Sequence, residues 1–131
     1  MTLPRFIAIV ATLLACAANA AADDGAARAA RAGRPLIGQP APAAVLRTLD
    51  GGTIDLAARY GRKPVYLKFW ATWCVPCRQQ MPGFERIYRQ YGKRIDVIAV
   101  NVGFSDTEAD VRAYRARHGL TMPIALDDGS L

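Results

Sequence analysis

Residues 65–77 of the chain read VYLKFWATWCVPC, a run of apolar residues that leads directly into two cysteines. Its first part, Val65–Ala71, is rich in β-branched and aromatic residues, which predicts a central strand buried on both faces. Large apolar side chains then recur at helical spacing until a glycine ends the pattern, and these residues are Met81, Phe84, Tyr88, Tyr91 and Gly92. Cys74 and Cys77 therefore stand where a strand ends and a helix begins.

Segments on both sides of this stretch predict further strands. Before it, Ala43–Leu49 and Thr53–Leu56 flank a turn signal at residues 50–52 and predict a β-hairpin. After it, Asp96–Val102 predicts a second buried strand and Pro123–Leu126 the start of another. With a helix on either side of Asp96–Val102, this order is typical of an α/β fold whose sheet contains parallel strands.

The second helix has recognisable start and stop signals. The segment Ser105–Glu108 has the spacing of a capping box, in which a serine and a glutamate satisfy the first backbone N–H groups. Val111, Tyr114 and His118 follow on one face, and Gly119 marks the end of the helix.

Composition and charge restrict the class of protein. The 131 residues correspond to one domain, since a domain has ~100–200 residues. The formal net charge is +6 and 52% of the residues are hydrophobic, which excludes a disordered or strongly polyanionic chain. No apolar run reaches the ~18–20 residues of a spanning helix, which excludes a polytopic membrane protein. Three cysteines and one histidine are too few for a disulfide scaffold or for two zinc sites.

The N-terminal residues have the pattern of an export signal. One positive charge in Met1–Arg5 precedes the apolar stretch Phe6–Ala18, and the small-x-small pattern that signal peptidase cuts follows, so residues 1–20 are interpreted as a secretory signal. The segment Leu13–Cys16 loosely resembles a bacterial lipobox, and the alternative is that an acylated Cys16 anchors the protein to a membrane. Both interpretations place the mature domain outside the cytoplasm, in the periplasm, where disulfide chemistry is permitted.

Residues 21–34 are almost all alanine, arginine, glycine and aspartate. Because they offer no large apolar side chain to bury, they are predicted to form a flexible linker. We interpret its arginines as part of a solvated basic segment and not as a contact site for lipid or nucleic acid. The globular domain is expected from residue 35 to residue 131.

The cysteine pair carries the predicted chemistry. A cysteine at a helix N-terminus faces unpaired N–H groups and the positive end of the helix dipole. This interaction stabilises a thiolate by up to ~2 kcal/mol. That would lower a thiol pKa from ~8.5 to near ~7, so Cys74 is predicted to be the nucleophile. Cys77, one turn further on, would be less exposed and would resolve the mixed disulfide. Pro76 lies in the first turn, where its missing N–H costs nothing, and it stiffens the spacer.

Two other interpretations of the pair are open. A purely structural disulfide gains little from closing so short a loop. A metal site needs four ligands, and this domain offers two thiolates and one distant histidine, so no metal is expected. His118 is interpreted as a residue near a helix C-terminus and not as a catalytic base.

Residues 69–77, FWATWCVPC, resemble the active-site segment of the thioredoxin superfamily, specifically that of the TlpA/ResA-like periplasmic thiol–disulfide reductases. Residues 37–42, 49–52, 81–82 and 99–102 fit the same redoxin pattern. The resemblance implies a thioredoxin-like fold with an N-terminal β-hairpin extension. It implies a protein-disulfide oxidoreductase without an organic cofactor. Its partners would be exported proteins with thiols or disulfides, of the apocytochrome c or copper-protein maturation type, and a membrane electron donor would re-reduce it. Trp70, Trp73 and Pro76 would shape the docking surface.

The chain departs from the family pattern in three places. Lys68 stands where thioredoxin has a buried aspartate, and we expect it to reach toward solvent. Gln80 replaces a frequent glutamate and cannot accept a proton. The chain ends at Leu131, before the cis-proline loop, two strands and last helix of the family, so residues 35–131 are expected to be an incomplete redoxin domain.

Two other function classes are weighed. Peroxiredoxins share the N-terminal pattern of residues 37–42, but their reactive cysteine lies in a T-x-x-C context that W-C-V-P-C does not match. A redox-inert binding module, such as a metallochaperone or nucleic-acid binder, has only the positive charge in its favour, and basic helix residues are usually a solvated face.

Overall fold

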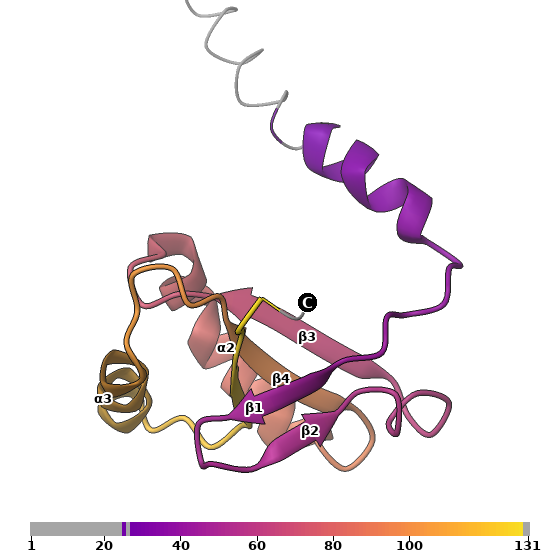
Figure 1. Ribbon diagram of the computed structural model, residues 1–131. Coiled ribbons are helices and arrows are strands. Elements are labelled where there is room, and N and C mark those ends of the chain that lie inside the picture. The colour runs from indigo at the N-terminus through magenta and orange to yellow at the C-terminus, as the bar shows by residue number, and fades with distance from the viewer. Residues whose placement is uncertain (1–24, 26, 130–131) are drawn as a thin grey trace, which may run out of the picture. The chain divides into compact units, whose positions relative to one another are not determined.

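The computed structural model describes residue 25 and residues 27–129. From Pro42 onward these residues form one α/β unit around a five-stranded sheet (Figure 1). Along the chain its elements are β1 (Val45–Thr48), β2 (Thr53–Asp55), β3 (Val65–Trp70), α2 (Val75–Tyr91), β4 (Asp96–Asn101), α3 (Glu108–His118) and β5 (Ile124–Leu126). The predicted α/β fold class and the order of its elements are confirmed.

The sheet has the order β2-β1-β5-β4-β3. Strands β3, β4 and β5 are parallel, with Val65 opposite Asp96 and Ala99 opposite Ile124. The β1–β2 hairpin joins β5 antiparallel, so the predicted hairpin extends a parallel sheet. Since β3 and β4 are parallel neighbours, their carboxyl ends lie at the same end of the strands. The cysteines follow β3 at this end.

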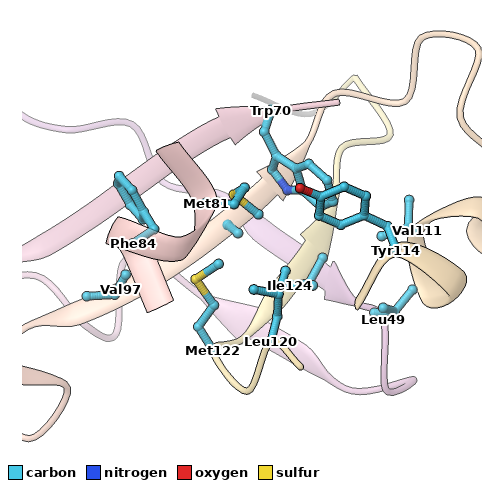
Figure 2. Close-up of a cluster of buried hydrophobic side chains, with 11 residues drawn as sticks. Leu49, Trp70, Met81, Phe84, Val97, Val111, Tyr114, Leu120, Met122 and Ile124 are labelled. Atoms are coloured by element: carbon cyan, nitrogen blue, oxygen red, sulfur yellow. The ribbon is translucent and has the colours of Figure 1, made fainter. Parts of the chain in front are cut away.

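Strand β4 is buried along its whole length and divides the core into two clusters. Because successive side chains alternate between the faces of a strand, Val97 and Ala99 face one cluster while Ile98 and Val100 face the other. Helices α2 and α3 both contribute to the first cluster (Figure 2), which comprises Leu49, Trp70, Met81, Phe84, Val97, Ala99, Val111, Tyr114, Leu120, Met122 and Ile124. The hairpin covers the second.

The prediction that Val65–Ala71 is a central strand buried on both faces is wrong for the described residues. Strand β3 lies at the edge of the described sheet, and Tyr66 and Phe69 are 45% and 46% exposed. An apolar run reports only that a strand favours burial, and it carries no information on which neighbours pair with it.

The start of α3 also differs from the prediction. Its N-cap is Thr107, whose side chain accepts a hydrogen bond from the Asp110 N–H while the Asp110 carboxylate accepts one from the Thr107 N–H. The capping box is therefore two residues later than Ser105–Glu108. Ser105 has a left-handed backbone, with a φ of 61°, which an N-cap does not adopt. The predicted helix end at Gly119 is confirmed, with a φ of 58°.

The described residues before Pro42 form a unit of their own. Residues 27–33 are helical, residues 28–33 are exposed, and a 3-10 turn, η1 (Arg34–Leu36), follows them. The linker predicted at residues 21–34 thus has regular structure in its described part, since alanine and arginine favour helix even where nothing is buried. The predicted signal at residues 1–20 and Cys16 lie outside the described residues. In the part of the chain that is described, no helix combines the length and the apolar character needed to cross a bilayer.

Candidate active site

Cys74 and Cys77 form a disulfide at the start of α2, with their Cα atoms 5.2 Å apart. Cys74 is the N-cap of the helix and has extended backbone, while Cys77 lies in the first turn. Both cysteines are half-buried, and Cys77 packs against the first core cluster. The structure therefore places the pair at the strand-to-helix junction that the sequence predicted.

The start of α2 is electrostatically positive. The first turn contains no acidic residue, and no side chain caps it. Pro76 is its second residue and has no N–H to leave unpaired. Arg78 directly follows Cys77, and its backbone N–H donates to the Cys74 carbonyl over 3.0 Å. A thiolate on Cys74 would face the unpaired N–H groups of this 17-residue helix, and the helix dipole would stabilise it.

Exposed apolar side chains lie next to Cys74 in the chain and in the loop after β4. Trp73, Val75 and Phe104 are 57%, 52% and 74% exposed. The Trp73 indole Nε1 donates to the Phe104 carbonyl over 2.6 Å, so the loop after β4 lies against the residue before Cys74. Apolar surface of this kind is typical of a site that contacts another polypeptide.

A carboxylate that the sequence analysis did not single out joins this loop to the active-site segment. Asp106 Oδ2 accepts from the Thr72 backbone N–H over 2.7 Å, and Asp106 Oδ1 accepts from the Thr72 hydroxyl over 2.5 Å. The buried Asn101 Nδ2 donates to the same Oδ2 over 2.7 Å. A signal for this contact existed, since polar residues that follow neighbouring parallel strands meet at one edge of the sheet.

Trp70 lies beneath the site and not on its surface. Its side chain is 1% exposed, and its ring centroid is 5.0 Å from that of Tyr114 in α3. Its indole Nε1 is buried and has no hydrogen-bond partner among the described residues. The two tryptophans thus differ. Trp73 is exposed, whereas the prediction that Trp70 shapes a docking surface is wrong, because its side chain is in the core.

Lys68 and Gln80 contact each other across β3 and α2. The Lys68 ammonium donates to the Gln80 side-chain oxygen and lies 5.7 Å from the centre of the Phe84 ring. The ammonium group of this half-buried lysine is therefore held by the side-chain amide of Gln80.

A second buried carboxylate lies farther along α2. Glu85 accepts from the backbone N–H groups of Thr121 and Met122 over 2.9 and 3.1 Å, from the Thr121 hydroxyl, and from Arg89 over 2.7 Å. Burial raises the pKa of Glu85, but these hydrogen bonds outweigh it and hold the pKa below its usual value of 4.5. Glu85 thereby fastens the turn between α3 and β5 to α2.

Within the described part of the chain, no three His, Cys, Asp or Glu side chains are grouped as metal ligands. His118, the last residue of α3, has its ring centroid 4.2 Å from that of Tyr114. Its position at a helix end agrees with the prediction.

Comparison with known proteins places this site in a family. The AhpC/TSA family model matches residues 37–131. The chain belongs to this family. Among curated relatives, the thioredoxin-like protein YneN of Bacillus subtilis (strain 168) is 44% identical over 91 residues, which cover 69% of this chain and 53% of YneN. The thiol-disulfide oxidoreductase ResA of Geobacillus thermodenitrificans (strain NG80-2) is 40% identical over 92 residues, covering 70% and 51%.

A solved structure agrees with this family assignment. The thiol:disulfide interchange protein of Chlorobium tepidum TLS, described as a thioredoxin family protein, superimposes with a TM-score of 0.60 at 27% identity and covers 68% of this chain and 60% of that one. The thioredoxin-like fold implied by residues 69–77 is thus confirmed. The chain spans about half the length of the curated relatives it matches.

Proposed function

We propose that the protein catalyses thiol–disulfide exchange with exported polypeptides through Cys74 and Cys77. The observation that carries this proposal is the Cys74–Cys77 disulfide, which lies at the positive N-terminus of α2 and is bordered by exposed apolar side chains. The relatives that match more than two thirds of this chain are named as thioredoxin-like or thiol-disulfide oxidoreductase proteins, which supports the same chemistry.

In the reducing direction the reaction starts from the dithiol. The Cys74 thiolate attacks one sulfur of a substrate disulfide, the substrate S–S bond breaks, and the second substrate sulfur leaves as a thiolate that takes up a proton. Cys77 then loses its proton and attacks Cys74 Sγ, which releases the first substrate sulfur as a thiol and forms the Cys74–Cys77 disulfide. Two electrons pass to the substrate, and an external thiol or membrane electron donor must supply two to regenerate the dithiol.

The substrate and location follow from the same proposal. A protein exported by residues 1–20, or anchored through Cys16, would act in the periplasm on proteins that must keep cysteines reduced, such as apocytochrome c or copper proteins. Neither an organic cofactor nor a metal takes part in the exchange steps.

A redox titration tests the proposal. In a Cys16→Ser background, the protein is equilibrated in glutathione or dithiothreitol buffers while tryptophan emission is recorded, because Trp73 adjoins Cys74. We expect a reversible two-electron transition that the Cys74→Ser variant lacks. A midpoint near or below ~−220 mV indicates a reductant, and one near ~−120 mV an oxidant. A folded protein without a transition would contradict the proposal.

A peroxidase is the second candidate function. The AhpC/TSA family model matches the chain, and the pattern of residues 37–42 is shared with peroxiredoxins. The pairing of Cys74 with a cysteine three residues away favours exchange with a disulfide. Consumption of hydrogen peroxide faster than reduction of a peptide disulfide would favour the peroxidase instead.

A further inference from the structure

We propose that Asp106 is a positioning residue for Cys74: it holds the segment before the nucleophile in place through Thr72. The inference rests on the proposed exchange function and assigns it a residue outside the cysteine motif. Asp106 is 32 residues from Cys74 in the sequence and comes from the loop between β4 and α3.

The Asp106 carboxylate accepts hydrogen bonds from both donors of Thr72. These are the backbone N–H, at 2.7 Å, and the side-chain hydroxyl, at 2.5 Å. Thr72 lies two residues before Cys74, in the short link between the end of β3 and the N-cap of α2. Because the N–H of this link is tied to a carboxylate, the path of the backbone into Cys74 is restricted at its midpoint.

On its other side, the Asp106 carboxylate is bound by a buried residue of the sheet. Asn101, the last residue of β4, is 1% exposed, and its Nδ2 donates to Asp106 while its Oδ1 accepts from the Gly103 N–H over 3.0 Å. The loop thus has a fixed support in the sheet. A second link runs in parallel, from the Trp73 indole to the Phe104 carbonyl. Two consecutive residues before Cys74 are therefore held by one loop.

Removing the charge of Asp106 and removing its positioning contacts would change the reaction rate of Cys74 in opposite directions. A carboxylate near Cys74 disfavours a thiolate, so removing only its charge would favour the thiolate and speed the reaction. Loss of positioning would slow it, because a misplaced nucleophile no longer faces the helix N-terminus or the substrate sulfur. The sign of the change in rate thus separates the two effects.

The variant Asp106→Asn keeps the hydrogen bonds and removes the charge. Its amide oxygen can accept from the Thr72 N–H and from Asn101, as Oδ2 does, and its NH₂ group can donate to the Thr72 hydroxyl, which is also an acceptor. Asp106→Ala removes all three contacts. A positioning role therefore predicts that asparagine restores what alanine loses.

The chain also contains a matched control. Asp110 accepts the backbone N–H and the hydroxyl of a threonine, Thr107, in the same pattern as Asp106, but its contacts stay within the start of α3. Asp110→Ala therefore removes a comparable pair of hydrogen bonds from the same region without touching the link to Cys74.

The test compares the reduced protein with its Asp106→Ala, Asp106→Asn and Asp110→Ala variants in a Cys16→Ser background. The rate of Cys74 with the neutral disulfide 4,4′-dithiodipyridine is measured against pH, together with the midpoint potential and the reduction of a disulfide-bonded peptide. Thr72→Val, which removes only the hydroxyl donor, provides a milder variant if Asp106→Ala fails to fold.

We expect Asp106→Ala to react about tenfold more slowly, with its pH profile moved to higher pH and its midpoint potential more negative, because its thiolate is less stabilised. Asp106→Asn should stay within about threefold of the parent and Asp110→Ala within about twofold, although the latter unfolds at a lower temperature. Thr72→Val should lie between parent and Asp106→Ala. Equal effects of Asp106→Ala and Asp110→Ala, or an asparagine variant as slow as alanine, would overturn the inference. A parent protein that does not reduce the peptide would instead overturn the proposed function.

Discussion

Two carboxylates join distant parts of this protein, and they do so in different places. Asp106 ties the loop after β4 to Thr72, two residues before Cys74, whereas Glu85 ties the middle of α2 to the turn before β5. Glu85 lies 11 residues after Cys74, about 16 Å along a helix at ~1.5 Å per residue. The same kind of contact therefore supports the reactive end of the fold in one case and its scaffold in the other.

Burial and hydrogen bonding alone therefore do not identify a functional carboxylate. Glu85 is the more buried of the two and accepts more hydrogen bonds, yet none of its partners adjoins a cysteine. Asp106 is half-buried, and what distinguishes it is the residue it holds. Stability and reactivity are thus expected to respond separately to changes at the two positions.

The largest effect on stability is expected at Glu85. Glu85→Ala leaves the N–H of the buried Met122 and that of Thr121 without their acceptor and should lower the free energy of unfolding by about 3 kcal/mol. Urea unfolding measures this loss. The rate of Cys74 with 4,4′-dithiodipyridine should change less than about twofold in the folded variant. A tenfold slower reaction would show that the Glu85 contact and the active site are coupled.

Lowering the pH should also reduce the free energy of unfolding that Glu85 contributes, but by less than Glu85→Ala does. Because the folded-state pKa of Glu85 lies below its usual value of 4.5, its contribution is complete above that value and is lost as the pH falls through the folded-state pKa. Unfolding curves between pH 6 and pH 3 measure the effect.

The variant Glu85→Gln isolates that contribution from those of Glu108 and Asp110, whose pKa values are also lowered by hydrogen bonds. The difference in unfolding free energy between parent and Glu85→Gln should shrink toward low pH. A difference that is constant with pH would show that the charge of Glu85 is not what stabilises the turn.

A smaller loss of stability is expected one residue away from Asp106. Thr107→Ala removes the N-cap of α3 and should lower the free energy of unfolding by about 1 kcal/mol. Since the hydrogen bonds of the Thr107 side chain stay within the start of α3, the exchange rate should match that of the parent protein. A loss of rate similar to that of Asp106→Ala would show that the whole loop, and not Asp106, holds Thr72.

The smallest effect is expected at Lys68. Its ammonium group is bound by the neutral Gln80 amide near the surface, where solvent and salt screen its charge. Lys68→Met keeps the chain length against Phe84 and should change the unfolding free energy by less than about 0.5 kcal/mol. The pH profile of Cys74 should be unchanged. A profile moved to higher pH would show that Lys68 stabilises the thiolate directly.

Local patterns predicted much of this structure. The change from a continuous apolar run to helical spacing at Cys74 predicted the strand-to-helix junction, and the turn signal at residues 50–52 predicted the hairpin. Each depends on residues that are neighbours in the sequence, so each can be recognised from the sequence alone.

The parts that the sequence did not predict are contacts between distant residues. Asp106 and Thr72 are 34 residues apart, and Glu85 and Met122 are 37 apart. The capping box was predicted two residues too early for the same reason. The Asp106 carboxylate accepts a hydrogen bond from Thr72, and the N-cap of α3 is the next residue, Thr107. The edge position of β3 depends on which strands pair with it, and no periodicity encodes that.

The role of Cys74 as the nucleophile of a thiol–disulfide exchange site is tested by trapping a mixed disulfide. In a Cys16→Ser background, reduced Cys77→Ser and Cys74→Ser variants are mixed with a disulfide-bonded peptide and the adducts are located by mass spectrometry. We expect a stable adduct on Cys74 in the first variant, since no resolving thiol is present, and far slower adduct formation on Cys77 in the second. Equal rates for the two cysteines, or no adduct on Cys74, would contradict it.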